Sequence, residues 1–300
     1  GLFRPLLAFS RADLESYASI HGLEWIEDES NKDVSFDRNF LRHKVLPIIS
    51  ERWPDCLSKL NHTANLCADS GHLTEVLAAQ DLTGMSEKSE RIGWSISIDD
   101  LACLKEPRQA NVLRYWASVH RLPSPRHSVL RVVLNEMLLA RPDAKPLIVW
   151  AGVQLRRFKK RLYLLPADSS DSNHHVADTG ESAITMQPSI KWDGINQIML
   201  PNKGSISTKL LSTGGLRISK QCDVEIRFRA GSERCKPFGR SGSNTLKKLF
   251  QEYALEPWLR SKVPLIYIDG KLAAVGDLWI CDGFFASPNE LGVELQWRLF

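Results

Sequence analysis

The chain has 300 residues, of which 43% are hydrophobic and 25% are charged, and its formal net charge is +4. This composition excludes a disordered chain, and no apolar run approaches the roughly 20 residues of a membrane-spanning helix. We therefore expect a folded cytoplasmic protein of about two domains, without a membrane partner. The six cysteines form neither a C-x-x-C pair nor a zinc-binding pattern, which favours reduced thiols and no metal site.

Two helices are expected near the N-terminus. Ser10 and Asp13 have the spacing of a capping box, and Gly22 is placed to end the helix that begins there. A second helix is expected to begin near Asp37, and Pro47 is expected to kink or end it. Because the first residues resemble the middle of a domain, we expect the chain to be part of a longer protein.

From Pro54 onwards the hydrophobic pattern predicts a mostly helical region. Prolines in the first turn favour helices that begin at Pro54 and Pro107, and a third helix is expected over residues 126–140. Three short apolar segments follow and predict strands, at residues 147–150, 153–155 and 162–165. The last two strands would form a β-hairpin.

A polar segment over residues 167–182 marks a linker, because it contains almost no apolar residues. Beyond it the pattern predicts seven short strands and one helix, which covers residues 244–253. The strands are expected at residues 197–200, 205–209, 215–219, 224–229, 263–268, 272–275 and 293–299. The C-terminal part is therefore expected to be β-rich.

The densest group of polar residues that could carry chemistry lies just before and within the second helix. Arg38 and Arg42 are four residues apart, so they share one face of that helix. Together with Asn39 they offer donors suited to a phosphate or a carboxylate. Asp28 and Asn31 come from the preceding turn. The alternative is an exposed helix on which both arginines pair with neighbouring aspartates.

Basic residues gather in two places. Five of the six residues from Arg156 to Arg161 are basic, and the segment from Arg227 to Lys262 carries nine basic residues against three acidic ones. Local patches of one sign favour phosphate binding more than the total charge does. A basic run is also commonly just a solvated surface, so both interpretations stay open on charge alone.

Motifs near the N-terminus resemble those of the bacterial tRNA(Ile)-lysidine synthases, in their longer, enterobacterial-like form. The motifs are R-P-L-L at residues 4–7, D-x-S-N at residues 28–31 and R-N-x-x-R at residues 38–42, in the order in which the family carries them. The region from Pro54 to Leu165 resembles the family's substrate-binding domain, and residues 224–275 resemble its C-terminal domain.

The resemblance implies an α+β fold in several parts. Residues 1–53 would be the rear part of an N-terminal α/β catalytic domain of the ATP-pyrophosphatase type. Residues 54–166 would form a mostly helical tRNA-binding domain, and residues 167–182 a linker. Residues 183–300 would form a small, β-rich C-terminal domain that also binds tRNA.

The resemblance also implies an activity. Members of the family ligate lysine to C2 of the wobble cytidine of tRNA(Ile) through an adenylated intermediate, so that its CAU anticodon reads AUA instead of AUG. ATP with Mg would be the cofactor, lysine the co-substrate and tRNA(Ile) the partner. The implied catalytic residues are Asp28, Asn31, Arg38, Asn39 and Arg42. The implied tRNA-binding residues are Arg4, Arg156, Arg157, Lys159, Lys160, Arg161, Arg229, Lys247, Lys248 and Arg260.

The sequence departs from the family pattern in two places. The ATP loop, S-G-G-x-D-S, has no counterpart: Ser241–Asn244 lacks the second glycine and the aspartate. We expect the loop upstream of Gly1 and this chain alone to be inactive. Ser232 stands where many relatives carry the aspartate of an R-x-G-D turn. The alternatives are a tRNA-binding module without catalysis of its own and a thiolase of wobble bases, which isolated cysteines disfavour.

Overall fold

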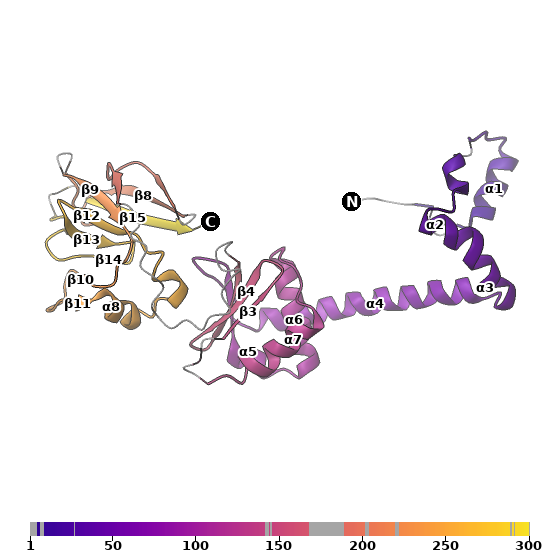
Figure 1. The fold of residues 1–300 in the computed structure, drawn as a ribbon, viewed down its shortest axis with the longest axis horizontal. Coiled ribbons are helices and arrows are strands. Elements are labelled where there is room, and N and C mark those ends of the chain that lie inside the picture. Colours follow the sequence, from indigo (N-terminus) through magenta and orange to yellow (C-terminus); the bar gives the residue numbers. More distant parts are fainter. Residues whose placement is uncertain are drawn as a thin grey trace. The chain divides into compact units, whose positions relative to one another are not determined.

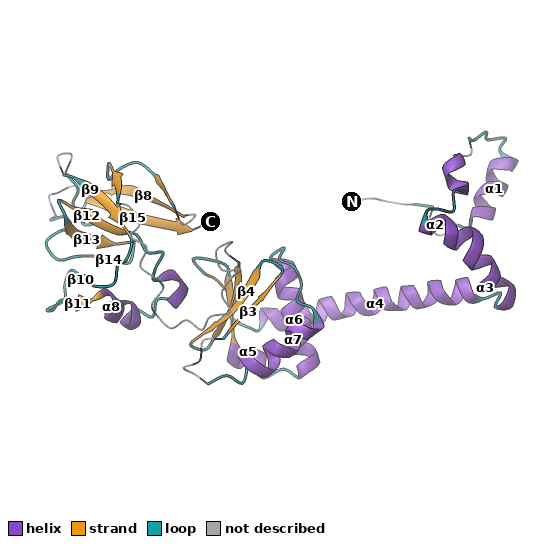
Figure 2. Cartoon of the chain, in the orientation of Figure 1, coloured by secondary structure: helices purple, strands orange, loops and turns teal. Residues whose placement is uncertain are grey.

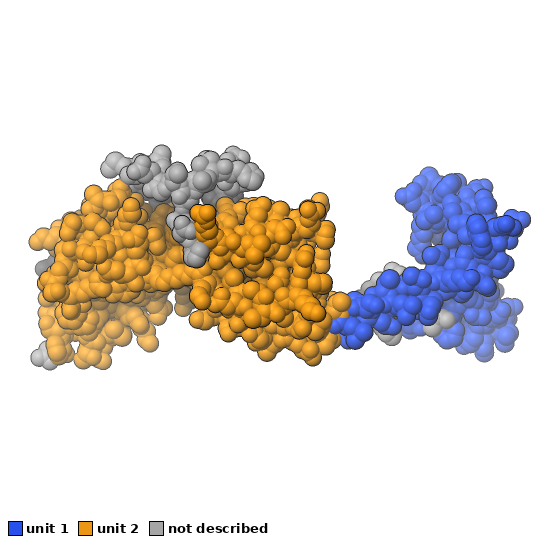
Figure 3. Space-filling view, turned by 90° about the horizontal axis from the view of Figure 1, so that it is seen from below, with its two compact units in different colours: residues 1–73 blue, residues 74–300 orange. Residues whose placement is uncertain are grey.

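The computed structural model describes residues 5–6, 9–26, 28–141, 144, 146–167, 189–201, 204–219, 222–288, 290 and 292–299. Helices and antiparallel sheets both occur (Figures 1 and 2), which confirms the predicted α+β class. The chain divides into two compact units, Gly1–Leu73 and Thr74–Phe300 (Figure 3). The domain boundaries predicted from the sequence stay predictions. No helix among the described residues is long and apolar enough to cross a membrane.

The first unit is helical. Helix α1 (Arg11–Ile20) begins at the predicted capping box, in which the Ser10 hydroxyl accepts from the Asp13 amide and the Asp13 carboxylate accepts from the Ser10 amide. The elements that follow are the 3-10 helix η1 (Glu29–Lys32), α2 (Asp37–Phe40), the π-helical turn η2 (Leu41–Val45) and α3 (Leu46–Arg52).

Pro47 does not end the second helix, which continues to Arg52. A proline removes a backbone donor from the helix and crowds the carbonyl of the turn before it. Here that turn is widened to π geometry, and the Leu46 N–H donates to the Leu41 carbonyl. The local widening therefore accommodates the proline without breaking the helix.

Helix α4 (Cys56–Thr83) runs across the boundary between the units and begins after Pro54 rather than at it. The leucines in the first part of the helix are exposed: Leu57 is 44% exposed and Leu60 is 60% exposed. Near its end, Ala78 and Leu82 are buried in the second unit. Only this last part of α4 contributes to a core of the described chain.

The second unit begins with a five-stranded antiparallel sheet in the order β1-β2-β5-β4-β3, next to the helices that pack on it (Figure 1). The three strands and the hairpin predicted here are confirmed. The strands are β1 (Lys88–Ser89), β2 (Trp94–Ser97), β3 (Leu147–Trp150), β4 (Val153–Phe158) and β5 (Arg161–Pro166). The helices are α5 (Ile98–Ala102), α6 (Glu106–Val119) and α7 (His127–Val132), followed by the π turn η3 (Val133–Met137).

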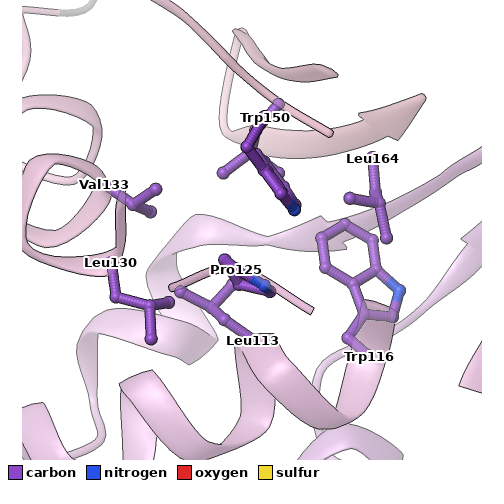
Figure 4. Close-up of a pocket in the computed structure, with 8 residues that line it drawn as sticks. Leu113, Trp116, Pro125, Leu130, Val133, Trp150 and Leu164 are labelled. Carbon is purple, nitrogen blue, oxygen red and sulfur yellow. The ribbon is translucent and has the colours of Figure 1, made fainter. Parts of the chain in front are cut away.

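Trp116 lies at the centre of the core between these helices and the sheet, and it is fully buried. In Figure 4 it converges with Leu113, Leu130 and Leu164 on a remaining cavity of about 10 Å³. A cavity of about 10–15 Å³ has room for a single water molecule. This space is therefore part of a packed core and not a ligand site.

The rest of the unit is β-rich, as predicted. Its five-stranded sheet has the order β14-β13-β12-β9-β6, its three-stranded sheet the order β15-β8-β7, and β10 pairs with β11. The strands are β6 (Ile190–Trp192), β7 (Ile198–Leu200), β8 (Gly204–Leu211), β9 (Val224–Arg227), β10 (Arg234–Cys235), β11 (Asn244–Thr245), β12 (Leu265–Ile268), β13 (Lys271–Val275), β14 (Trp279–Ile280) and β15 (Gly292–Leu299). The helices are α8 (Leu246–Glu252) and the 3-10 helix η5 (Pro257–Leu259).

Two expectations about this region need correction. The strand expected at residues 215–219 is reduced to bridges at Leu216. The cysteines are not all reduced, because Cys235 and Cys281 form a disulfide, with their Cα atoms 6.0 Å apart. Both cysteines are buried, and 46 residues separate them in the sequence. Most of the predicted linker, residues 168–182, lies outside the described residues.

Candidate functional site

The D-x-S-N turn of the first unit is fixed by its own aspartate. The Asp28 carboxylate accepts a hydrogen bond of 2.9 Å from the Ser30 amide and so caps η1. Hydrogen bonds from the Ser30 hydroxyl and amide lower the pKa of Asp28. The carboxylate therefore stays ionised and holds the turn in one conformation.

The helix that follows clamps the same turn. The Asn39 side chain is only 8% exposed, and its amide donates to the Ser30 carbonyl at 2.8 Å and the Asp33 carbonyl at 2.9 Å. His43, one turn later, has Nε2 2.9 Å from the Asn31 carbonyl. Asn39 thus positions the turn, and its amide hydrogens are not available to a substrate. His43 was not predicted, although its spacing from Asn39 places both on one helical face.

Arg38 and Arg42 are exposed. Neither forms an ion pair or hydrogen bond with any of the residues that the structure describes, so the aspartate-paired helix of the alternative interpretation is not observed. Asp33, for example, accepts from the Ser35 amide instead. The two guanidinium groups are therefore available for an external anion.

The different roles of Asn39, which holds the turn, and Arg42, which faces solvent, are testable by a substitution at each position. Asn39→Ala removes two hydrogen bonds from a buried side chain to backbone carbonyls and should lower the stability of this turn by about 1–3 kcal/mol. Arg42→Ala removes an unpaired surface group and should change stability by no more than about 0.5 kcal/mol. Amide hydrogen exchange over residues 28–40 measures both. Equal protection in the two variants would contradict the assignment of Asn39 as a clamp.

In the basic run of the β4–β5 hairpin, Arg157 and Arg161 form several internal hydrogen bonds. Arg157 donates to the carbonyls of Met137 and Ala140, at 2.6 and 2.8 Å, at the end of η3. Arg161 donates to the hydroxyl and carbonyl of Ser95, at 2.7 and 2.8 Å. Both attach the hairpin to the rest of the domain, which leaves few of their donors for a phosphate. Their predicted contacts with RNA stay predictions.

The two lysines at the tip of the hairpin are exposed. Lys160 pairs with Asp99 at 2.9 Å, but the two side chains are 83% and 64% exposed, so water and salt screen the pair strongly. Lys159 extends from the turn itself, with Nζ 5.9 Å from the Phe158 ring centroid. Charge at this tip is therefore accessible to a polyanion.

Helix α8 has one buried face and one exposed face. Leu246, Leu249 and Phe250 are buried, whereas Lys247 and Lys248 are exposed and make no ion pair with the described residues. The other residues predicted to contact RNA differ in their exposure and bonding. Arg229 is partly buried, Arg260 donates to the Leu255 carbonyl, and Arg4 lies outside the described residues.

Within the second unit, one arginine connects the first sheet to the β-rich part. Arg91 donates to both carboxylate oxygens of Asp277, at 2.9 and 3.0 Å, and to the backbone carbonyl of Trp297. Its guanidinium carbon also lies 4.4 Å from the centroid of the Trp297 ring. Arg91 and Asp277 are only about a quarter exposed, at 25% and 23%. We call this contact the Arg91 joint.

Aromatic residues extend the same junction to the basic hairpin. Trp258 packs edge-on against Tyr163, with ring centroids 4.9 Å apart, and Arg156 lies over the Trp258 ring at 5.5 Å. Glu256 is hydrogen-bonded to Tyr163, and burial raises the pKa of both groups. The hairpin and the β-rich part are therefore in direct contact.

The Arg91 joint predicts a stability difference between two arginine substitutions. Arg91→Ala leaves the Asp277 carboxylate, which is about a quarter exposed, without its ion-pair partner and should destabilise the second unit by about 1–3 kcal/mol. Arg91→Lys should recover only part of this loss, because an ammonium group cannot donate as a planar fork. Urea unfolding measures the difference, with Lys160→Ala as the control for an exposed ion pair. If Arg91→Ala lowers the free energy of unfolding no more than this control does, the Arg91 joint does not stabilise the second unit.

Known protein families match separate regions of this chain. Three family models match in chain order: a PP-loop domain over residues 1–49, the TilS substrate binding domain over residues 96–163 and the TilS substrate C-terminal domain over residues 224–297. The tRNA(Ile)-lysidine synthase of Coxiella burnetii is 38% identical over 98% of this chain, and that of Legionella pneumophila strain Lens is 35% identical over 95%. The chain is similar to tRNA(Ile)-lysidine synthases along nearly its whole length.

The match covers only part of each relative. The chain spans 63% of the Coxiella protein and 62% of the Legionella protein. A crystal structure of a TilS C-terminal domain is 18% identical, with a TM-score of 0.27, and covers 38% of this chain and 98% of that chain. The first unit corresponds to the region of the PP-loop match, and its D-x-S-N turn and R-N-x-x-R helix lie within that match.

Proposed function

We propose that this chain is the larger part of a cytoplasmic enzyme that ligates lysine to C2 of the wobble cytidine of tRNA(Ile). The observation that carries the proposal is the order of three family domains along one chain. Two features of the structure support it. Unpaired arginines lie beside a fixed polar turn in the PP-loop region, and accessible lysines lie in both regions that match the TilS substrate domains.

In this proposal the first unit supplies one side of the reaction site. Arg38 and Arg42 would neutralise phosphate oxygens of ATP or of the anticodon loop, and Asp28 and Asn39 would keep the turn before them in place. ATP would supply the activated leaving group at the cytidine carbonyl, so that lysine can displace AMP. The donors present fit a phosphate, but the S-G-G-x-D-S loop is not in the sequence. Among the described residues there is no cluster of three or more metal-ligand side chains, so Mg is not assigned to them.

The activity is tested by incorporation of labelled lysine into tRNA(Ile). The 300-residue chain alone should incorporate none at saturating ATP, because its sequence lacks the ATP loop. A longer form that includes the loop should be active, and Arg42→Ala in that form should lower turnover by more than about tenfold with folding intact. Lysine transfer by the 300-residue chain would show that the loop is dispensable. Arg42→Ala with unchanged turnover would remove this arginine from the site.

A second candidate is a tRNA-binding module without catalysis of its own, favoured by the missing ATP loop. Under both candidates the second unit binds RNA. The lysine assay distinguishes the two candidates. A longer form that contains an S-G-G-x-D-S loop but transfers no lysine would favour the binding module.

RNA binding by α8 makes a separate prediction. Each lysine–phosphate contact releases a counterion, so the logarithm of affinity falls linearly with the logarithm of salt concentration. The double substitution Lys247→Ala and Lys248→Ala should make that slope shallower by up to about two units. Titration of tRNA(Ile) at several salt concentrations measures it, with Lys209→Ala on β8 as the control. An unchanged slope would remove α8 from the interface.

A further inference from the structure

A groove opens in the β-rich part of the second unit between the strands β14 and β15. Among the described residues each is the edge strand of its own sheet, and its outer side is bonded to other backbone groups at one point: the Phe238 N–H donates to the Ile280 carbonyl of β14, and Leu216 exchanges hydrogen bonds with Val293 of β15. The groove has a volume of about 640 Å³, which lies within the range of about 300–1,000 Å³ typical of sites for small ligands. It contains none of the residues that the sequence motifs pointed to. The lining residues that matter here are Phe238, Tyr253, Trp279, Phe285, Leu295 and Arg298.

Two of the lining rings are exposed and are supported from behind. Phe238 is 54% exposed, and its ring is stacked on Phe285 with centroids 4.2 Å apart and an angle of 6° between the planes. Tyr253 is 49% exposed and packs against Trp279 with centroids 4.8 Å apart. Rings that are held in this way lose little entropy when a ligand binds. Exposed aromatic faces are the surfaces on which unpaired nucleobases stack.

On the open edge of β15, the N–H and C=O groups of Leu295 have no partner among the described residues. Alternate residues of an antiparallel strand point their N–H and C=O groups to the same side. On the open side, Val293 exchanges hydrogen bonds of 2.8 and 2.9 Å with Leu216, and the groups of Trp297 are bonded by the Arg91 joint. Leu295 lies between them, and no described residue is bonded to its N–H and C=O on that side. A donor beside an acceptor complements the edge of a base.

The segment that supplies two of the aromatic rings of the groove is basic, which favours a polyanion as the ligand. The segment that supplies Phe238 and Tyr253, from Arg227 to Lys262, carries nine basic residues against three acidic ones. Arg298 lines the groove together with two acidic residues, Glu294 and Asp277, and the Asp277 carboxylate is paired with Arg91. Proline-rich peptides also bind grooves of aromatic residues, but they carry no charge that requires basic surroundings.

We propose that the groove between β14 and β15 binds an unpaired nucleobase from a single-stranded segment of the RNA substrate. The base stacks on Phe238 or Tyr253, its edge meets the peptide of Leu295, and the basic segment faces the flanking phosphates. This inference rests on the proposed function, because the ligand is RNA. It adds a subsite that reads an unpaired nucleotide, separate from the phosphate contacts of α8.

The test uses a five-nucleotide single-stranded RNA with 2-aminopurine at its centre, because the fluorescence of this base falls when it stacks. The whole chain should quench the fluorescence at saturation. The double substitution Phe238→Ala and Tyr253→Ala should weaken binding at least tenfold, since base stacking on an aromatic side chain contributes about 1–3 kcal/mol per base. The control is Tyr17→Ala, which removes a tyrosine of similar exposure, 59%, from the first unit.

Each outcome separates the subsite from the proposed function. Quenching that is lost in the double variant and kept in the control supports the subsite, provided that circular dichroism shows the variant folded. A folded double variant that binds the oligonucleotide as the unsubstituted chain does overturns it. Tight tRNA binding without any oligonucleotide binding also overturns the subsite and leaves the proposed function intact. Binding of a proline-rich peptide instead of the oligonucleotide overturns the assignment to RNA.

Discussion

The arrangement of the second unit depends on the ion pair between Arg91 and Asp277 and on the hydrogen bond that Arg91 donates to the end of β15. A guanidinium group that is three-quarters buried needs several acceptors, and here it has a carboxylate and a backbone carbonyl. The same contact covers part of the open edge of β15, which would otherwise be a template for pairing with another chain. One ion pair therefore fixes the junction with the first sheet and covers the open edge of β15 at Trp297.

This junction bears on the proposed binding of RNA by the second unit. A polar linker in the sequence favours domains that move independently. The contacts of Trp258 with Tyr163 and Arg156 instead bring the basic hairpin and the β-rich part into one unit. Cations that are held in a fixed arrangement lose less entropy on binding a rigid RNA than cations on a flexible tether. The spacing between these cations then becomes a property of the fold.

Much of the local structure could be predicted from the sequence, because local signals determine it. The capping box at Ser10, the proline-initiated helix α6 and the basic hairpin all follow from residues within a few positions of each other. The Arg91 joint could not be predicted, since its partners are 186 residues apart in the sequence. The same holds for the pair Cys235–Cys281.

For the candidate site, the sequence indicates which residues form the turn and the helix, but not the surroundings of each side chain. Motif spacing singles out the turn and the helix, but it does not distinguish a side chain that is buried under the turn from one that faces solvent. Asn39 and Arg42 belong to one motif, yet the first is 8% exposed and internally bonded and the second is exposed. In the same way, a count of charges in the hairpin gives no sign that Arg157 and Arg161 already donate to the protein.

The tip of that hairpin carries a residue that the backbone does not favour. Lys159 has a φ of +53°, in the left-handed region where glycine or asparagine fits with less strain. A lysine there costs about 1 kcal/mol relative to a residue suited to the turn. At this position the positive charge of the lysine is gained at the expense of backbone stability. Laboratory evolution for thermal stability alone would therefore replace Lys159 by glycine or asparagine. Selection that also requires the positive charge at the tip would keep the lysine.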